Sequence, residues 1–149
     1  MLTARDIMTT EVVTVSPETD VAQAARLLLE KHINGIPVVN SSLGVVGILC
    51  QSDLISQQKK ISLPSLFTML DGFISFSSTK NFDKEFKKIA AIKVAEAMTP
   101  DPITVSPDTT IEDIATLMVN RGFHTIPVIQ EDRLVGVIGK EDVLKTIIS

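Results

Sequence analysis

The chain contains two copies of one pattern, and this duplication is the feature that most limits how it can fold. Shifting the sequence by ninety residues places Ile36-Pro37-Val38 on Ile126-Pro127-Val128, and one deletion after Asp132 then aligns Asp53 with Asp142. Matches at a fixed offset over about fifty positions indicate a tandem repeat. Other coinciding groups are Met8-Thr9 and Met98-Thr99, Thr14-Val15-Ser16-Pro17 and Thr104-Val105-Ser106-Pro107, and Gly47 and Gly136.

The length of the chain predicts that the two copies fold together. A chain of 149 residues buries roughly two-thirds of its unfolded surface, whereas a unit of about fifty residues is marginal by itself. We therefore expect the copies to pack on each other as one unit with pseudo-twofold symmetry.

The composition argues against several classes of protein. A net charge of -4 argues against a general nucleic-acid binder, which needs a basic surface. The single cysteine, Cys50, excludes a disulfide framework and a cysteine-rich metal site, and two isolated histidines make no metal site. No apolar run approaches the roughly eighteen residues that span a bilayer, and the first residues show no secretory pattern. These features predict a cytoplasmic protein without a membrane span.

Each copy has the same order of predicted elements: strand, helix, strand, strand and a short closing helix. Asp20 followed by Gln23 has the form of a capping box before the first helix, and Lys31-His32 are expected to end that helix. In the second copy, Thr110 is the expected cap and Gly122 lies just past the helix end. This order predicts an α+β fold (α/β layers) in which helices cover a small sheet. The predicted strands span residues 12–15, 36–39, 44–49, 126–129 and 134–138, and the closing helices begin near Asp53 and Asp142.

Residues 56–93 have no counterpart in a second copy. This segment is too long for a structureless loop, and apolar residues recur three or four apart within 63–73 and 82–90, which predicts two amphipathic helices. Its seven lysines against three acidic residues distinguish it from the acidic repeats. We expect this helical insert to mediate self-association or partner docking. The alternative is that it folds back over its own core.

The repeated phrases resemble a known family, the tandem CBS (cystathionine β-synthase) domain pair, often called a Bateman module. In the first copy they read IMTTEVVTVSPETDVAQAARLL, HINGIPVV and GILCQSDL, and in the second AMTPDPITVSPDTTIEDIATLM, FHTIPVI and GVIGKEDVL. The resemblance covers residues 4–55 and 94–147 as two CBS repeats, with 56–93 as the insert between them. It implies two β-α-β-β-α repeats that enclose two clefts.

The resemblance also implies what these clefts bind and with which residues. Adenosine-containing ligands such as AMP, ADP, ATP or S-adenosylmethionine are expected there. An aspartate of one repeat is expected to accept hydrogen bonds from the ribose hydroxyls, and backbone atoms of the other repeat are expected to hold the base. One cleft is then expected to combine Ser52, Asp53, Ile103, Thr104, His124, Thr125 and Ile126. The other is expected to combine Val13, Thr14, Gly35, Ile36 and Asp142.

The sequence departs from the family phrase at two positions. Cys50 and Gly139 stand where threonine or serine is usual, so a hydroxyl that often contacts phosphate is missing. Ser52 is a possible replacement in the first copy, and the amides of a helix start bind anions without any side chain. Because the second copy offers Gly139 and Glu141 instead, we expect the cleft with Asp53 to bind nucleotide more tightly.

Some of these residues have a structural explanation that needs no ligand. An aspartate in the first turn of a helix caps unpaired amides and interacts with the helix dipole. His124 is either a phosphate-facing residue or a solvated histidine at a strand edge. His32 is expected to supply a favourable charge at a helix end.

The leading hypothesis is a stand-alone regulatory or sensor module that signals to a partner. It requires no cofactor, because the adenosyl compound is a regulatory ligand. Catalytic residues are not expected, since the only recurring polar group is one aspartate per repeat. The alternative is an assembly or dimerisation module with vestigial ligand sites. The resemblance also implies a homodimer formed through helices.

Overall fold

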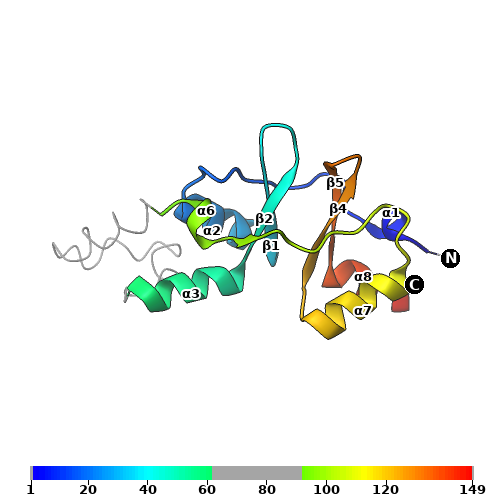
Figure 1. Ribbon diagram of the computed structural model, residues 1–149. Coiled ribbons are helices and arrows are strands. Elements are labelled where there is room, and N and C mark those ends of the chain that lie inside the picture. Colours follow the sequence, from blue (N-terminus) through cyan, green and yellow to red (C-terminus); the bar gives the residue numbers. More distant parts are fainter. Residues whose placement is uncertain (1, 62–91, 149) are drawn as a thin grey trace.

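The computed structural model describes residues 2–61 and 92–148. The two helices predicted within residues 63–90, and the docking role predicted for them, lie outside these ranges. Figure 1 shows the described residues as two halves placed side by side, with β1 and β2 in one half and β4 and β5 in the other.

The helices and strands of the two halves follow the same order, except that the second half contains an additional two-residue strand. The first half of the chain forms α1 (Ala4–Ile7), α2 (Val21–Glu30), β1 (Gly35–Val39), β2 (Val45–Cys50) and α3 (Gln51–Ile61). The second forms α6 (Val94–Ala97), β3 (Thr99–Pro100), α7 (Ile111–Arg121), β4 (Thr125–Gln130), β5 (Arg133–Gly139) and α8 (Lys140–Ile148). The predicted α+β fold built from two repeats is therefore confirmed. Helix α3 continues past residue 55, the predicted end of the first repeat.

The strand pairing repeats down to its irregularities. β1 and β2 pair antiparallel with a register shift between Val38 and Val39, and β4 and β5 pair antiparallel with a shift between Val128 and Ile129. These shifts lie ninety positions apart. The predicted strand at 12–15 is reduced to one parallel bridge, between Val15 and Val38, because the chain turns at Ser16 and the following proline has no amide to donate.

The closing helices α3 and α8 begin near Asp53 and Asp142 as predicted, whereas the predicted cap of the long helix is confirmed in the second half only. The Thr110 hydroxyl accepts the Asp113 amide at 3.2 Å, and Gly122 ends α7 in the left-handed conformation. The capping box predicted at Asp20 is wrong, because its carboxylate makes no cap hydrogen bond and accepts instead from the Lys93 ammonium at 2.6 Å. This hydrogen bond raises the pKa of Lys93. The amide of Val21 donates to the carbonyl of Ile92, which brings Lys93 alongside Asp20.

Each half begins with a helical turn that packs on the other half (Figure 1). Ala4 of α1 is fully buried in the core of the second half with Ile114 and Ile126. Val94 of α6 is fully buried in the core of the first half with Leu28 and Leu49, among others. The sequence analysis did not predict these turns. We call residues 2–9 and 92–100 the exchanged segments.

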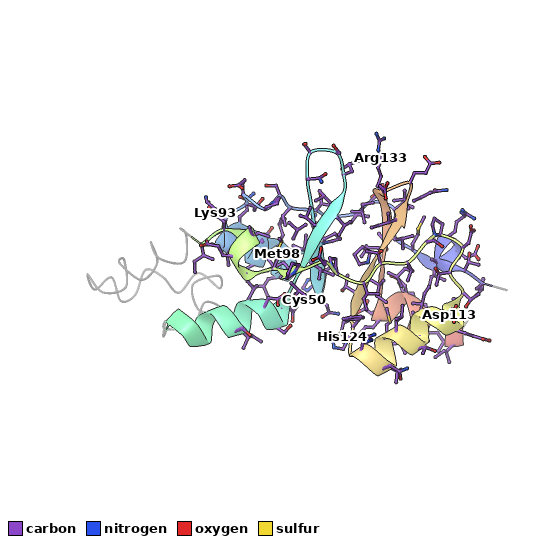
Figure 2. The ribbon with its side chains drawn as sticks, viewed as in Figure 1. Cys50, Lys93, Met98, Asp113, His124 and Arg133 are labelled. Atoms are coloured by element: carbon purple, nitrogen blue, oxygen red, sulfur yellow. The ribbon has the colours of Figure 1, made fainter. Side chains whose placement is uncertain are left out.

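Two glycines receive the methionines of the exchanged segments. A Cβ atom added to Gly136 would lie 2.6 Å from the sulfur of Met8 and 3.1 Å from the backbone oxygen of Thr9. A Cβ atom on Gly47 would collide in the same way with the sulfur of Met98. Figure 2 shows Met98 lying against the first half. The Thr9 amide also donates to the Val137 carbonyl at 2.9 Å, and the Thr9 carbonyl accepts from the Val137 amide at 3.0 Å. Each glycine therefore allows close approach of the other repeat.

The close approach at Gly136 predicts that Gly136→Ala destabilises the protein. The methionine side chain can move, but the Thr9 carbonyl belongs to the paired backbone, so we expect a loss of about 1 to 3 kcal/mol, the usual cost of overpacking. Urea unfolding measures this loss. The matched control is Gly139→Ala on the same strand, where the nearest atoms to an added Cβ lie at 3.8 Å and stability should be retained. Equal effects of the two substitutions would contradict the prediction.

Candidate functional site

Two cavities lie where the two halves meet. The first cleft has a volume of about 600 Å³ and the second about 290 Å³, against roughly 300 to 1,000 Å³ for small-molecule sites. The first is lined by Asn34, Ile48, Cys50, Gln51, Ser52, Asp53, Ile55, Thr99, Asp101, Pro102, Ile103, Arg121, Gly122, Phe123, His124, Thr125 and Lys140. The second is lined by Thr9, Glu11, Val13, Lys31, His32, Ile33, Asn34, Gly35, Pro37, Thr125, Val137, Gly139, Lys140, Glu141, Asp142 and Lys145.

The two clefts are built from corresponding parts of the repeats. Each takes the end of one long strand and the following helix start from one half. From the other half it takes the segment before the Ser-Pro turn and the residues that join the first long helix to its strand. Asp53 thus faces residues of the second half, and Asp142 faces residues of the first. This crossed arrangement is the one implied by the family resemblance.

Most of the predicted site residues line the expected cleft, and four do not. Ser52, Asp53, Ile103, His124 and Thr125 line the first cleft, and Val13, Gly35 and Asp142 line the second. Ile126 and Ile36 are fully buried in the two cores, because side chains alternate along a strand and their neighbours face the clefts. Thr104 lines neither cleft, and Thr14 lines a separate shallow cavity near Ser16. None of these four residues lines the cleft predicted for it.

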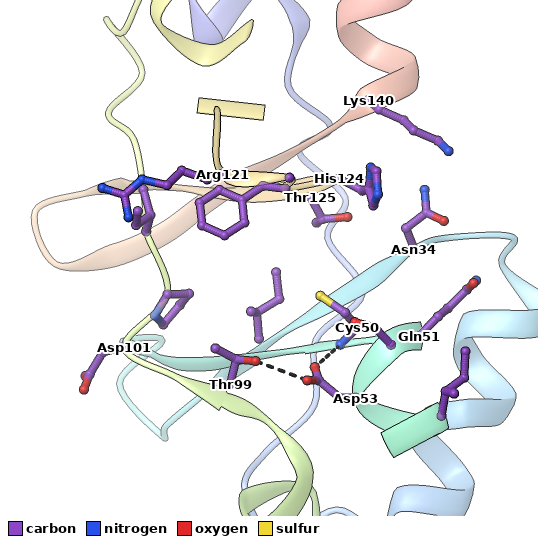
Figure 3. Close-up of a pocket in the computed structure, with 17 residues that line it drawn as sticks. Asn34, Cys50, Gln51, Asp53, Thr99, Asp101, Arg121, His124, Thr125 and Lys140 are labelled. Atoms are coloured by element: carbon purple, nitrogen blue, oxygen red, sulfur yellow. Dashed lines mark hydrogen bonds between the residues drawn. The ribbon is translucent and has the colours of Figure 1, made fainter. Parts of the chain in front are cut away.

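Both aspartates lie in the first turn of a helix, and each accepts the amide of the residue just before that helix. The Asp53 carboxylate accepts the Cys50 amide at 2.7 Å through Oδ2 and the Thr99 hydroxyl at 3.2 Å through Oδ1 (Figure 3). The Asp142 carboxylate accepts the Gly139 amide at 2.8 Å. The structural explanation of these aspartates is therefore confirmed. A carboxylate has about four acceptor positions, so each retains capacity for ligand hydroxyls.

The comparisons with known proteins agree with this architecture. The CBS domain family matches residues 4–60 and 94–149. This chain belongs to the CBS domain family. An uncharacterized protein of Methanocaldococcus jannaschii, MJ1426, is 28% identical over 152 residues, covering 97% of this chain and 90% of that protein. The chloroplastic CBS domain-containing protein CBSX2 of Arabidopsis thaliana is 29% identical over 136 residues, but 88% of this chain spans only 56% of that relative's length.

A solved structure matches the whole CBS pair. The crystal structure of CBSX2 in complex with AMP superposes with a TM-score of 0.75 at 26% identity, covering 99% of this chain and 97% of that one. The tandem CBS pair predicted from the sequence is therefore confirmed. In the part of the chain that the structure describes, no helix is long and apolar enough to cross a membrane. The same part holds no group of three or more metal-ligating side chains.

Several residues of the CBS clefts were missed by the sequence analysis. Arg121 and Phe123 line the first cleft, and Lys31 lines the second. The ninety-residue offset pairs Lys31 with Arg121 and His32 with Gly122. These pairings could have identified Lys31 and Arg121 as cleft residues, because in both copies they lie shortly before the Ile-Pro-Val phrase. His32 lies at the end of α2 with φ 53, in the position where Gly122 ends α7.

Cys50 lies at the boundary between the first cleft and the core. Burial, and secondarily the negative charge of Asp53, raise the pKa of its thiol from 9.0 to about 11. The thiol form is therefore the dominant form at neutral pH. An uncharged thiol offers only a weak donor where the family phrase has a hydroxyl.

The raised pKa predicts slow alkylation of Cys50 in the folded protein. At pH 8 the folded protein carries about a hundredfold less thiolate than a cysteine with a pKa of 9.0, and thiolate is the reacting form. The iodoacetamide reaction rate should rise with pH to a midpoint near 11 in the folded chain and near 9.0 in urea. Between these values the unfolded chain binds fewer protons, so stability should fall as pH rises. A folded-state midpoint at 9.0 would contradict the assignment.

Proposed function

We propose that this CBS pair is a regulatory module that binds adenosine-containing ligands in its two clefts and signals to a partner. The observation that carries the proposal is the crossed pairing in each cleft of an aspartate from one half with the phrase before Ile-Pro-Val from the other. The AMP complex of CBSX2, which is 26% identical and similar over the whole chain, supports the class of ligand. The module requires no cofactor and carries no proposed catalytic residue.

The first cleft offers a separate contact for each part of a nucleotide. Asp53 Oδ1 can accept a hydrogen bond from a ribose hydroxyl, either beside the Thr99 hydroxyl or in its place. Ile48, Ile103 and Phe123 supply apolar lining, which suits a purine base because aromatic and aliphatic side chains stack on flat rings.

The charged part of a nucleotide has basic partners in the first cleft. Arg121, His124 and Lys140 line it together with the acidic Asp53 and Asp101. Figure 3 shows His124 and Lys140 at one side and Arg121 at the other. Arginine binds phosphate through two parallel hydrogen bonds and lysine through a point charge. These side chains supply the phosphate contacts that Cys50 cannot.

The two clefts are unequal, and the first is the better nucleotide site. Its volume is about 600 Å³ against about 290 Å³, and its basic residues face two carboxylates. The second places Lys31, Lys140 and Lys145, with His32, against three carboxylates, those of Glu11, Glu141 and Asp142. Lysine and arginine side chains balance the carboxylates in both clefts, so the ranking rests on the larger volume of the first.

Asp53→Asn should weaken AMP binding about ten- to a hundred-and-fifty-fold. The asparagine oxygen can still accept the Cys50 amide, so the helix cap is kept while the acceptor for the ribose is replaced by a donor. Loss of a hydrogen bond to a charged group costs about 1.5 to 3 kcal/mol. Titration calorimetry with AMP, ADP, ATP and S-adenosylmethionine measures it. The matched variant Asp142→Asn should lose less total affinity, and a larger loss there would show that the ranking of the clefts is wrong.

Self-association is a second candidate function. Val119 of α7 and Ile147 and Ile148 of α8 are 81%, 74% and 85% exposed, and these two helices contact each other. Exposed aliphatic side chains on two helices that contact each other favour an interface. We propose a second copy of this chain as the occupant, since a twofold dimer covers the same surface on both copies.

The mass in solution tests the dimer. Light scattering should give twice the chain mass for the unmodified protein and the chain mass for Ile147→Asp, because a buried carboxylate opposes association. The control is Leu43→Asp, which changes an aliphatic side chain that is 49% exposed on the loop between β1 and β2 and should leave the mass unchanged. A monomeric unmodified protein would overturn this candidate without affecting ligand binding.

A further inference from the structure

The two clefts are adjacent and share a wall. Asn34, Thr125 and Lys140 line both of them. The wall lies at the pseudo-twofold axis, where Gly35 of β1 meets its repeat partner Thr125 of β4, and a Cβ atom added to Gly35 would lie 3.2 Å from the Thr125 side chain. Ligands bound in the two clefts are therefore separated by only a few side chains.

Lys140 is the one lysine or arginine that lines both clefts in the described part of the chain. Its backbone is fixed, because its amide donates to the carbonyl of His124 at 3.0 Å. Its side chain is exposed and forms no salt bridge among the described residues. Figure 3 shows it beside His124 and Asn34. The ammonium can therefore turn toward either cleft.

The corresponding residue of the first copy is neutral. Alignment of Asp53 with Asp142 places Gln51 on Lys140. The side-chain amide of Gln51 donates to the Ile33 carbonyl at 3.2 Å. A symmetric pair would have two cations at the shared wall, one for each cleft. This chain has a single cation there.

We propose that Lys140 couples the two clefts, so that phosphate-bearing ligands oppose each other's binding. The phosphate of the first ligand draws the Lys140 ammonium toward its own cleft. The second ligand then meets a cleft that has lost this cation and that lies near the negative charge of the first phosphate. This inference rests on the proposed function. It adds that the coupling depends on the charge of the ligand, so adenosine, which has no phosphate, binds the two clefts independently.

Titration calorimetry with AMP and adenosine tests the coupling. The Asp142→Asn variant gives the affinity of the first cleft alone, and the Asp53→Asn variant gives that of the second. The unmodified protein gives the affinity for filling both clefts. We expect AMP to fill both clefts about tenfold more weakly than the product of the separate affinities predicts. Adenosine should show no such deficit. Both ligands meet the same ribose and base contacts, so the difference isolates the phosphate.

The variant Lys140→Gln, which introduces the residue of the first copy, should remove most of the tenfold deficit, and Lys140→Arg should retain it. Lys145→Gln on the same helix lines only the second cleft, so it should weaken that cleft and leave the deficit unchanged. A deficit that persists in Lys140→Gln, or equal deficits for AMP and adenosine, would overturn the coupling and leave the proposed function intact. If neither AMP nor adenosine binds at all, the proposed function itself fails.

Discussion

The packing of each exchanged segment on the opposite half is the contact on which the rest of the molecule depends. Ala4 and Val94, each from the opposite half, complete the two cores, and Met8 and Met98 lie against glycines where no Cβ atom fits. A half separated from its partner would expose part of its core, in keeping with the marginal stability of a fifty-residue unit. The pair is therefore the folding unit, and its two halves are held at a defined distance.

The same exchange creates the clefts. Thr99 pairs with Ile48 at β2, and its hydroxyl then reaches Asp53 of the first half at 3.2 Å. Thr9 occupies the matching place beside Val137 and lines the cleft of Asp142. Each aspartate thus shares its cleft with a threonine of an exchanged segment. Any motion of one half relative to the other would change the shape of both clefts, which is the property that a ligand-sensing module needs.

The sequence could predict the repeat and the order of elements, because identical phrases at one offset must occupy equivalent positions, whereas the pairing of most cleft residues was implied by the family resemblance. It could not predict that Asp20 would bind Lys93, since that contact depends on where the chain returns after the insert. Helices of four residues, such as α1 and α6, are too short to show a periodicity. Arg121 precedes the phrase that carries the resemblance and Phe123 begins it, and the resemblance assigned neither of them a role.

The two copies have diverged unequally, and the difference follows from their physical roles. The methionine, the threonine after it and the facing glycine are identical in both copies, because close backbone approach allows little else. Around the shared wall, Asn34 pairs with His124, Gly35 with Thr125 and Gln51 with Lys140. All six residues line one or both clefts, so their differences change the charge and size of each cleft. A duplicated scaffold with identical packing contacts can therefore hold two chemically different sites that share one cation.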